Sequence, residues 1–380
     1  MEISNYLKFM VEHNASDLFF SVGAPVNIKI EGETSSIGDK NLTSADVRQL
    51  AYSIMNDNQV TTFESRLELN MAFSVANMGR FRVNVFRQRG DTAMVIRYIK
   101  SKIPSIESLG LPDILKDLIM EYQGLILVVG STGSGKSTTL ASMINYRNEK
   151  KTGHILTIED PIEFIHEHKK SIVDQREVGL DTLSLSEALM NALREAPDVI
   201  VVGEIRDRET MRHALHYAET GHLCLSTLHA NNANQTMERI INFFPDTAHH
   251  GLLLDLGQHL RAIISQRLIN GINGKRTPAV EIMLKTPFIA ELIEDHRISE
   301  IKDAMEQGTL AGMQTFDQSL YKLFKDGKIT IDEALRNADS KNNLRLRLRL
   351  EDPEQFTSDD KLQMKEDEDL VHRIDSKKRK

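Results

Sequence analysis

The sequence predicts a mixed α/β protein, in which a small α+β domain is followed by a larger α/β domain and a helical C-terminal region. Three observations lead to this prediction. Strands are grouped without βαβ alternation up to about residue 100, helices and short apolar strands alternate in the middle of the chain, and helical patterns dominate after Asn231. With 380 residues, the chain is long enough for two or three domains that each bury a core.

The first domain is expected to cover residues 1–99. Its pattern predicts helices at residues 3–13 and 43–55, and strands at residues 17–22, 26–31, 70–76, 80–86 and 92–99. Thr43 and Asp46 have the spacing of a capping box at the start of the second helix. Because Phe86 and Arg87 break the alternation of the fourth strand, we expect that strand to end or bulge there. The grouped strands predict an antiparallel sheet with flanking helices.

A second domain is expected over residues 105–285, after a linker at residues 100–104 in which Pro104 fixes the chain. The pattern predicts strands at residues 126–129, 154–158, 198–205 and 223–227. It predicts helices at residues 113–122, from the glycine-rich loop after the first of these strands to about 148, and at 184–195 and 208–219. This alternation is typical of a parallel sheet that is covered by helices on both faces.

A C-terminal helical bundle is expected over residues 286–350. After Asn231 the pattern predicts one apolar strand, at residues 279–284, and helices at residues 246–268, 288–295, 299–307, 315–325 and 331–338. Alternating Leu and Arg at residues 344–350 are compatible with a strand, although they follow helical segments. Residues 351–380 contain ten acidic and seven basic residues and few large apolar ones, so we expect this tail to be disordered or to fold only when it docks.

Composition excludes several classes of protein. No run of about 18 apolar residues is present, so no transmembrane segment is expected. The first residues lack a basic segment followed by a long apolar one, so no signal peptide is expected. The single cysteine, Cys224, excludes a disulfide framework and fits a reducing cytosol. A formal net charge of −8 argues against sequence-independent nucleic-acid binding, although a local basic face remains compatible with it.

A glycine-rich loop after the buried strand at residues 126–129 fits the phosphate-binding pattern GxxxxGK[ST]. Its predicted nucleotide-binding residues are Gly130, Ser131, Thr132, Gly133, Ser134, Gly135, Lys136, Ser137 and Thr138. The glycines allow backbone N–H groups to surround phosphate oxygens at the positive end of the next helix. We expect Lys136 to reach the β- and γ-phosphates and the Ser137 hydroxyl to bind Mg²⁺. The loop therefore predicts a nucleotide site.

Hydrolysis also requires a carboxylate that holds Mg²⁺ or polarises the attacking water, usually at the tip of a neighbouring strand. Glu159 and Asp160 close one predicted strand, with Glu163 nearby, and Glu204 follows the buried run 199–203. An acid at the end of a buried strand is costly to keep without a task, which favours a catalytic Glu204 over a helix cap.

Two histidines and a group of arginines are further candidates. His222 and His229 flank the predicted strand 223–227 and either pack and cap locally or sense phosphate; neither has the partners of a zinc site. The basic patch of the first domain consists of Arg80, Arg82, Arg87, Arg89 and Arg97. It is either a solvated sheet face or a source of one or two arginines that face a nucleotide phosphate across a domain or subunit boundary.

Three segments follow the phosphate loop in order, at residues 156–161, 197–207 and 220–231. They resemble the Asp box, the Walker B box and the His box of the secretion-superfamily ATPases. Residues 1 to about 350 are similar to the type IV pilus retraction ATPases of the PilT/PilU family. The resemblance implies a homohexameric ring built from a PAS-like N-terminal domain and a RecA-like P-loop ATPase domain. It also implies ATP and Mg²⁺ bound at the boundary between domains and subunits.

The resemblance also implies roles for individual residues. Lys136 and Ser137 bind phosphate and Mg²⁺, and Glu204 is the catalytic carboxylate of the Walker B box. The remaining assignments are Glu159 and Glu163 to the catalytic Asp box, His222 and His229 to the phosphate-sensing His box, and Arg82, Arg87 and Arg97 to the N-domain region that reaches the phosphates.

Two features of this sequence distinguish between the branches of this ATPase superfamily. A single cysteine rules out the tetracysteine zinc module of the extension and secretion motors, which favours retraction. The segment 288–295 lacks the arginines of the corresponding PilT helix, whereas segments 312–318 and 334–339 and the charged tail resemble PilU. The resemblance therefore implies an ATPase that assists a PilT-like ATPase in pilus retraction and twitching motility.

This assignment predicts a cytoplasmic protein, peripheral at the inner-membrane base of the pilus machine. Its expected partners are copies of itself, a PilT-like ATPase and the inner-membrane platform protein, with no nucleic acid. Three alternatives remain: a stand-alone PilT-like retraction motor, a nucleotide-binding protein that acts mainly by docking onto PilT, and a DNA-directed RecA-like motor. The last would need a basic channel, which the net charge of −8 does not favour.

Overall fold

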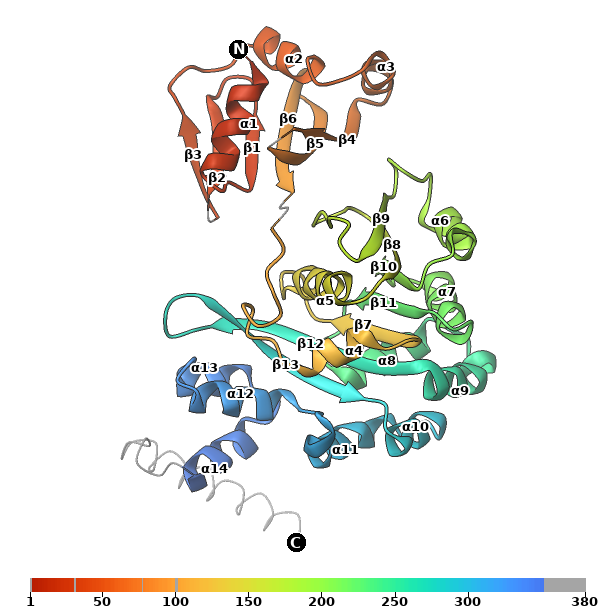
Figure 1. Ribbon diagram of the computed structural model, residues 1–380. Helices are drawn as coiled ribbons and strands as arrows, with labels where there is room; N and C mark the ends of the chain where they lie inside the picture. Colours follow the sequence, from red (N-terminus) through yellow and green to blue (C-terminus); the bar gives the residue numbers. More distant parts are fainter. Residues whose placement is uncertain (1, 31, 77, 100–101, 352–380) are drawn as a thin grey trace, which may run out of the picture. The chain divides into compact units, whose positions relative to one another are not determined.

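The computed structural model describes residues 2–30, 32–76, 78–99 and 102–351 (Figure 1). The chain forms two compact units. One contains residues 1–108, 113–126 and 137–228, and the other contains residues 109–112, 127–136 and the chain from 229 onward. These units cut across the domain limits expected from the sequence, which remain a prediction. The tail predicted to be disordered, residues 351–380, lies outside the described residues except for Glu351.

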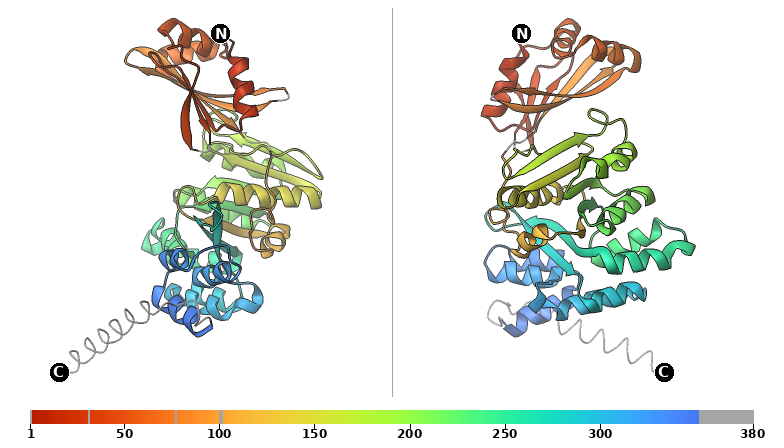
Figure 2. Two further views of the ribbon diagram at one scale, coloured as in Figure 1. Left: turned by 90° about the vertical axis from the view of Figure 1, so that its left-hand side faces the viewer. Right: turned by 45° about the vertical axis from the view of Figure 1, so that its right-hand side comes forward.

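The first unit begins with a six-stranded sheet, drawn in red to orange in Figure 2, whose strand order is β3-β2-β1-β6-β5-β4. The strands are β1 (Asp17–Phe20), β2 (Val26–Ile30), β3 (Glu33–Ile37), β4 (Glu68–Val75), β5 (Gly79–Gln88) and β6 (Asp91–Ile99), and the helices are α1 (Ile3–Glu12), α2 (Ser44–Tyr52) and α3 (Asp57–Arg66). All neighbouring strands are antiparallel, as predicted. Their apolar face packs against the helices around Phe20, Phe63 and Phe81.

Local details of this sheet confirm one prediction and correct another. Asp46 N–H donates to Thr43 Oγ1 (3.2 Å) and Thr43 N–H donates to the Asp46 carboxylate (3.0 Å), so the capping box is present. The predicted end or bulge at Phe86 and Arg87 is wrong, because β5 pairs regularly with β6 as far as Gln88. Arg87 can occupy an apolar-face position because its guanidinium lies 5.0 Å from the centroid of the Phe63 ring. Neither β3, which is almost entirely exposed, nor α3, which buries one side chain, was predicted.

A seven-stranded sheet has the order β13-β12-β7-β11-β10-β8-β9. Its strands are β7 (Gly124–Val129), β8 (Gly153–Glu159), β9 (Ser171–Glu177), β10 (Val199–Glu204), β11 (Leu223–Leu228), β12 (Leu260–Asn270) and β13 (Arg276–Leu284). Strands β8 to β11 pair in parallel, as predicted for this region, and β9 extends them at one edge. The accompanying helices are α4 (Ile114–Met120), α5 (Lys136–Lys150), α6 (Leu185–Ala192) and α7 (Arg208–Glu219).

The second unit corrects the prediction of a single strand after Asn231. The expected helix at residues 246–268 is divided into α9 (His249–His259) and strand β12, which pairs antiparallel with β13. A short apolar run such as residues 262–264 has no period that separates a buried strand from a buried helix, which explains the error. The other helices are α8 (Ala233–Asn242), α10 (Pro287–Glu294), α11 (Ile301–Gln307), α12 (Phe316–Lys325), α13 (Ile331–Asn337) and α14 (Lys341–Glu351).

The segment with alternating Leu and Arg forms helix α14, so the strand considered for residues 344–350 is wrong. Leu344 and Leu348 are buried, whereas Leu346 and Leu350 are exposed. A spacing of four residues places the first pair on one face of a helix, where they join the core formed by α12 and α13. Within the described part of the chain, no helix has both the length and the apolar character needed to cross a membrane.

Candidate functional site

The phosphate loop connects strand β7, all of whose residues are buried, to helix α5. Gly130, Gly133 and Gly135 have φ values of +155°, +78° and +91°, which residues with a side chain rarely adopt. Lys136 Nζ donates hydrogen bonds to the carbonyl oxygens of Gly130 (2.9 Å) and Ser131 (3.0 Å). The lysine therefore lies along the inside of the loop, where its ammonium group is placed to meet phosphate oxygens.

The walls of this loop leave no space for larger residues. A Cβ atom on Gly130 would lie 2.4 Å from Ser134 Oγ and 2.5 Å from the carbonyl oxygen of Gln266, and one on Gly135 would lie 2.8 Å from Gln266 Nε2. Ser134 is buried, and its hydroxyl has no hydrogen-bond partner within the described chain. A buried hydroxyl and backbone N–H groups at a helix start fit phosphate oxygens as partners. The predicted loop residues are thus compatible with a bound nucleotide.

Glu159 and Glu204 lie at the ends of adjacent strands. Strands β8 and β10 are parallel neighbours, so their carboxyl ends meet at one edge of the sheet, where Glu159 and Glu204 are the last residues. Gly203 permits this approach, since a Cβ atom there would lie 3.2 Å from the Ile158 carbonyl oxygen. The structure thus places the two glutamates that the sequence assigned to strand tips at the ends of neighbouring strands.

The environment of Glu159 favours the protonated form more than water does. Burial raises the pKa of Glu159, while hydrogen bonds from Thr157 Oγ1 (2.7 Å) and Gln175 Nε2 (3.2 Å) oppose the shift. The Glu163 backbone also hydrogen-bonds Glu159, and its own side chain is exposed. Glu159 therefore has fixed neighbours, whereas Glu163 contacts it through the backbone.

Arg206 connects the two acidic segments and was missed from the sequence. Its Nε donates to the Glu204 carboxylate (2.7 Å), and its Nη1 lies 3.7 Å from the Asp160 carboxylate. The Glu204 carboxylate raises the pKa of Arg206. The only sequence signal was its position two residues after Glu204, which does not by itself distinguish a partner from a solvated side chain.

The two candidate histidines lie at opposite ends of β11, with His222 before its first residue and His229 after its last. The His222 ring approaches the Thr220 hydroxyl (3.1 Å) and the Tyr217 carbonyl oxygen (3.3 Å) through Nδ1. Strands β10 and β11 are parallel, so His222 lies at the sheet edge opposite to Glu204. Phosphate sensing by His222 remains a prediction.

The candidate arginines lie on both faces of the N-terminal sheet. Arg82 and Arg97 are directly opposite each other on β5 and β6, on the face away from Phe81. Arg97 Nε donates to the buried Asp17 (2.8 Å). Arg87 lies on the other face, where it donates to Glu64 (2.8 Å) and Thr92 (3.2 Å).

Helix α8 follows the end of β11 and is anchored by an internal carboxylate. Glu281 on β13 is 2% exposed and accepts hydrogen bonds from Ala233 N–H (2.7 Å) and Ser265 Oγ (3.0 Å). Burial raises the pKa of Glu281 to about 7, against the effect of these two bonds. Since Ala233 is the first residue of α8, Glu281 holds the start of this helix to the β12-β13 hairpin.

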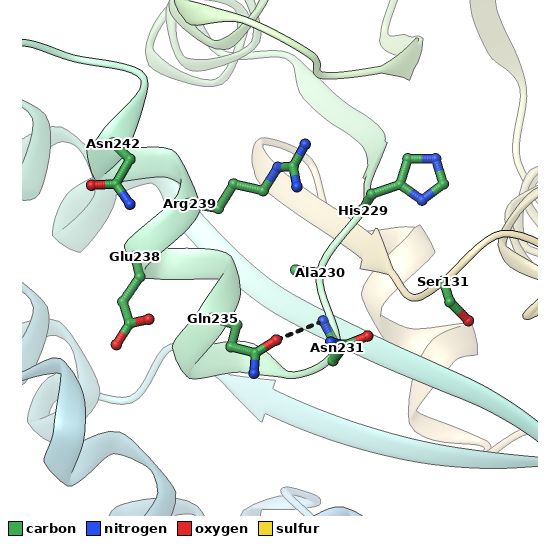
Figure 3. A pocket seen from close by; sticks show the side chains of 8 residues that line it. All are labelled: Ser131, His229, Ala230, Asn231, Gln235, Glu238, Arg239 and Asn242. Carbon is green, nitrogen blue, oxygen red and sulfur yellow. Dashed lines mark hydrogen bonds between the residues drawn. The ribbon is translucent and has the colours of Figure 1, made fainter.

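A polar pocket of about 330 Å³ lies beside the phosphate loop within the second unit (Figure 3). It is lined by Ser131, by residues 229–231 and by the polar face of α8. His229 and a loop residue of the phosphate site thus share one pocket. In the described part of the chain, no group of three or more His, Cys, Asp or Glu side chains is arranged to hold a metal by itself.

This fold and this loop define the chain as a P-loop protein with carboxylates at neighbouring strand ends. It matches the family model for type II/IV secretion system proteins over residues 2–349. It is 50% identical to the type IV pilus ATPase PilU of Pseudomonas aeruginosa over 351 residues, 92% of each chain. It is 46% identical to the pilus retraction ATPase PilT of the same organism over 338 residues, 89% of this chain and 98% of PilT.

A solved structure gives the same result. The crystal structure of the pilus retraction motor PilT with bound ADP has a TM-score of 0.85 and 42% identity to this chain, covering 91% of this chain and 99% of that one. The chain therefore belongs to the type II/IV secretion system family, and within it to the type IV pilus ATPases of the PilT and PilU kind.

Proposed function

We propose that this chain is a hexameric, PilU-like ATPase that assists a PilT-like ATPase in retracting type IV pili during twitching motility. The observation that carries the proposal is the 50% identity to PilU across 92% of both chains. The proposed place of action is the cytoplasmic side of the inner-membrane base of the pilus machine, next to the platform protein. The bound-ADP structure of PilT supports a nucleotide at the corresponding loop here.

The proposed architecture has five parts. Residues 1–99 form a PAS-like domain, residues 100–104 a linker, residues 105–285 a RecA-like ATPase core, residues 286–350 a helical bundle and residues 351–380 a charged tail. The antiparallel sheet with flanking helices supports the first part, and the parallel strands β8 to β11 support the third. The β12-β13 hairpin belongs to the core and not to the bundle in this division.

In the proposed reaction, Lys136 and the backbone of the phosphate loop bind the β- and γ-phosphates of ATP. Mg²⁺, when bound, would neutralise phosphate charge, and Ser137 and Glu159 are its proposed holders in this chain. Glu204 would orient the attacking water and accept its proton, while Arg206 fixes the Glu204 carboxylate (2.7 Å). Glu163 is proposed to adjust Glu159 through its backbone contact.

The arginine that stabilises the transferred phosphoryl group is proposed to be Arg82, with Arg97 as its neighbour. Arg82 lies directly opposite Arg97 on the paired strand, and Arg97 is already bound by Asp17 (2.8 Å), so Arg82 is the member of the pair proposed to meet the phosphoryl group. Arg87 is the weaker candidate, since it is held by Glu64 on the opposite face of the sheet. His229 is proposed to sense the γ-phosphate from its pocket beside Ser131.

The experiment that tests this function measures ATP hydrolysis and pilus retraction separately. Purified chain with Mg²⁺ is expected to hydrolyse ATP without a PilT-like ATPase. In cells, pilus retraction is expected to require the PilT-like ATPase and to gain force or speed when this chain is also present. Normal twitching in a strain that has this chain but no PilT-like ATPase would contradict the accessory role. Absence of hydrolysis by the purified chain would contradict the motor role.

A further inference from the structure

The pocket beside the phosphate loop contains groups that bind oxyanions. Figure 3 shows the Arg239 guanidinium pointing toward His229, with Ser131 on the far side of the histidine. A guanidinium binds oxyanions through its N–H edge. The ring of Phe243 lies 6.0 Å from the Arg239 guanidinium carbon, and a contact of this kind uses the flat face and not that edge. The orientation of Arg239 therefore favours an anion in the pocket.

Gln235, in the first turn of helix α8, adds a donor to the same pocket. Asn232 caps the helix by accepting a hydrogen bond from Gln235 N–H (2.9 Å). The Gln235 side-chain oxygen accepts a bond from Asn231 N–H (3.3 Å), so the group that Gln235 presents to a ligand is its NH₂ donor. An amide donor and a guanidinium thus line the same pocket.

The pocket is joined to the phosphate loop through one residue. Ser131 lines the pocket, and its carbonyl oxygen accepts a hydrogen bond from Lys136 Nζ (3.0 Å). The opposite wall is held in place because Glu281 binds the first N–H group of α8 (2.7 Å). A group that leaves the lysine therefore has an open polar pocket next to it.

The pocket has room for a hydrated anion, and its charge favours one. A volume of about 330 Å³ corresponds to roughly ten water molecules at about 30 Å³ each, which is enough for a hydrated tetrahedral anion. Of the described residues that line the pocket, Glu238 is the acidic one, and in Figure 3 its carboxylate points away from His229. The anion side of the pocket thus lies toward Arg239 and Ser131.

We propose that this pocket binds the inorganic phosphate released by ATP hydrolysis, between Arg239, His229 and Ser131, before the phosphate reaches solvent. Hydrolysis joins a water oxygen to the γ-phosphorus and breaks its bond to the bridging oxygen, which gives ADP, inorganic phosphate and a proton. The free phosphate then leaves Lys136 and binds Arg239. The proposal rests on the proposed ATPase reaction of this site, but not on the role in pilus retraction.

The test measures phosphate binding directly. Inorganic phosphate is titrated calorimetrically into the full chain loaded with Mg²⁺ and ADP, and into the variants R239Q, E238Q and R276Q. R239Q is expected to weaken phosphate binding by about tenfold or more, because it removes a charge-assisted contact. E238Q is expected to tighten it, because it removes a negative charge. R276Q alters an exposed arginine outside the pocket and serves as the control, with phosphate affinity equal to that of the unaltered chain.

Opposite signs for R239Q and E238Q support the site, and general damage to the fold does not produce them. If R239Q fails to fold, tighter binding by E238Q carries the same conclusion. Equal phosphate affinity of E238Q and the unaltered chain overturns the proposal, as does a loss of ADP affinity in R239Q as large as its loss of phosphate affinity. ADP formation from ATP is measured separately, so that absence of hydrolysis contradicts the proposed function while the binding result still stands.

Discussion

Lys136 and Glu204 contribute at different stages of the proposed reaction. Lys136→Ala and Glu204→Gln are both expected to abolish hydrolysis, but only the first removes a charge that meets phosphate in the ground state. Its loss should weaken ATP affinity by about tenfold or more, whereas Glu204→Gln keeps an oxygen acceptor for Arg206 and should still bind ATP. Titration with a fluorescent nucleotide checks both. An equal loss of ATP affinity in the two variants would contradict the catalytic role of Glu204.

Arg82 and Arg87 are predicted to have separable effects. Arg82→Ala should lower turnover far more than nucleotide affinity, since an arginine that stabilises transferred phosphoryl charge contributes about 10³–10⁵ in rate. Arg87→Ala should instead lower the free energy of unfolding by about 1–2 kcal/mol, because it loses Glu64 and the ring of Phe63. Steady-state ATPase rates and urea unfolding distinguish the two. Unchanged turnover in Arg82→Ala would indicate that this face of the sheet is an ordinary solvated surface.

The buried Glu281 predicts a pH dependence of stability. Its pKa is raised to about 7 in the folded chain, from 4.5. Between these values the folded state binds more protons than the unfolded state, so this group lowers stability as pH rises and its full cost is present above pH 7. Glu281→Gln keeps an oxygen for Ala233 N–H and should be more stable than the unaltered chain by up to ~3 kcal/mol at pH 8, with little of that gain left near pH 4.5. Chemical unfolding at several pH values measures this difference in the free energy of unfolding, with Glu306→Gln as an exposed control. A difference that does not change with pH would contradict the raised pKa of Glu281.

At the scale of single residues, the sequence identifies those that lie inside a contiguous motif. The phosphate loop was recognisable because its glycines, lysine and serine are adjacent in the chain. Gln266 and Glu281 were not recognisable, because they reach the loop and α8 only through the pairing of β12 with its neighbours. Arg206 was inside a recognised segment, but its role depends on the direction of one side chain.

Helix α14 shows how a period is misread at the scale of an element. Leu and Arg alternate with a period of two, yet the segment forms a helix in which Leu344 and Leu348 face the core. Leu348→Ala is therefore expected to lower the free energy of unfolding by about 2–4 kcal/mol, and Leu346→Ala by less than about 0.5 kcal/mol. Urea unfolding of both variants tests this directly. Similar losses in the two would contradict the helix, since a strand places both leucines on one face.

Other elements were predicted where sequence period and burial agree. Helix α7 and strand β11 show this agreement: α7 has one apolar face, and every residue of β11 is buried. Strand β12 was missed because burial on both faces removes its alternation, and β9 because only three of its seven residues are buried. In both cases the strand is defined by its pairing with a neighbouring strand, which a single sequence does not show.

For the whole molecule, we predict a homohexamer that also assembles with a PilT-like ATPase. Native mass measurement in the presence of ATP should show six copies of this chain alone and a larger or mixed assembly when the partner is added. In cells, Lys136→Ala should impair motility as much as deletion of the chain if hydrolysis drives retraction. Motility of the Lys136→Ala strain near that of the unaltered strain would instead support a protein that acts mainly by docking.

Strand β12 carries three consecutive residues with different partners. Ser265 donates to Glu281, Gln266 lies against Gly130 and Gly135, and Arg267 donates to Asp339 (2.8 Å) near the start of α14. Successive side chains of a strand point to opposite faces, so one inserted residue would turn each of them toward the wrong partner. Relatives of this chain can therefore change length in the turn after residue 270, but not within β12 itself. The distance along the chain from the phosphate loop to this strand can vary during evolution, while the number of residues within the strand cannot.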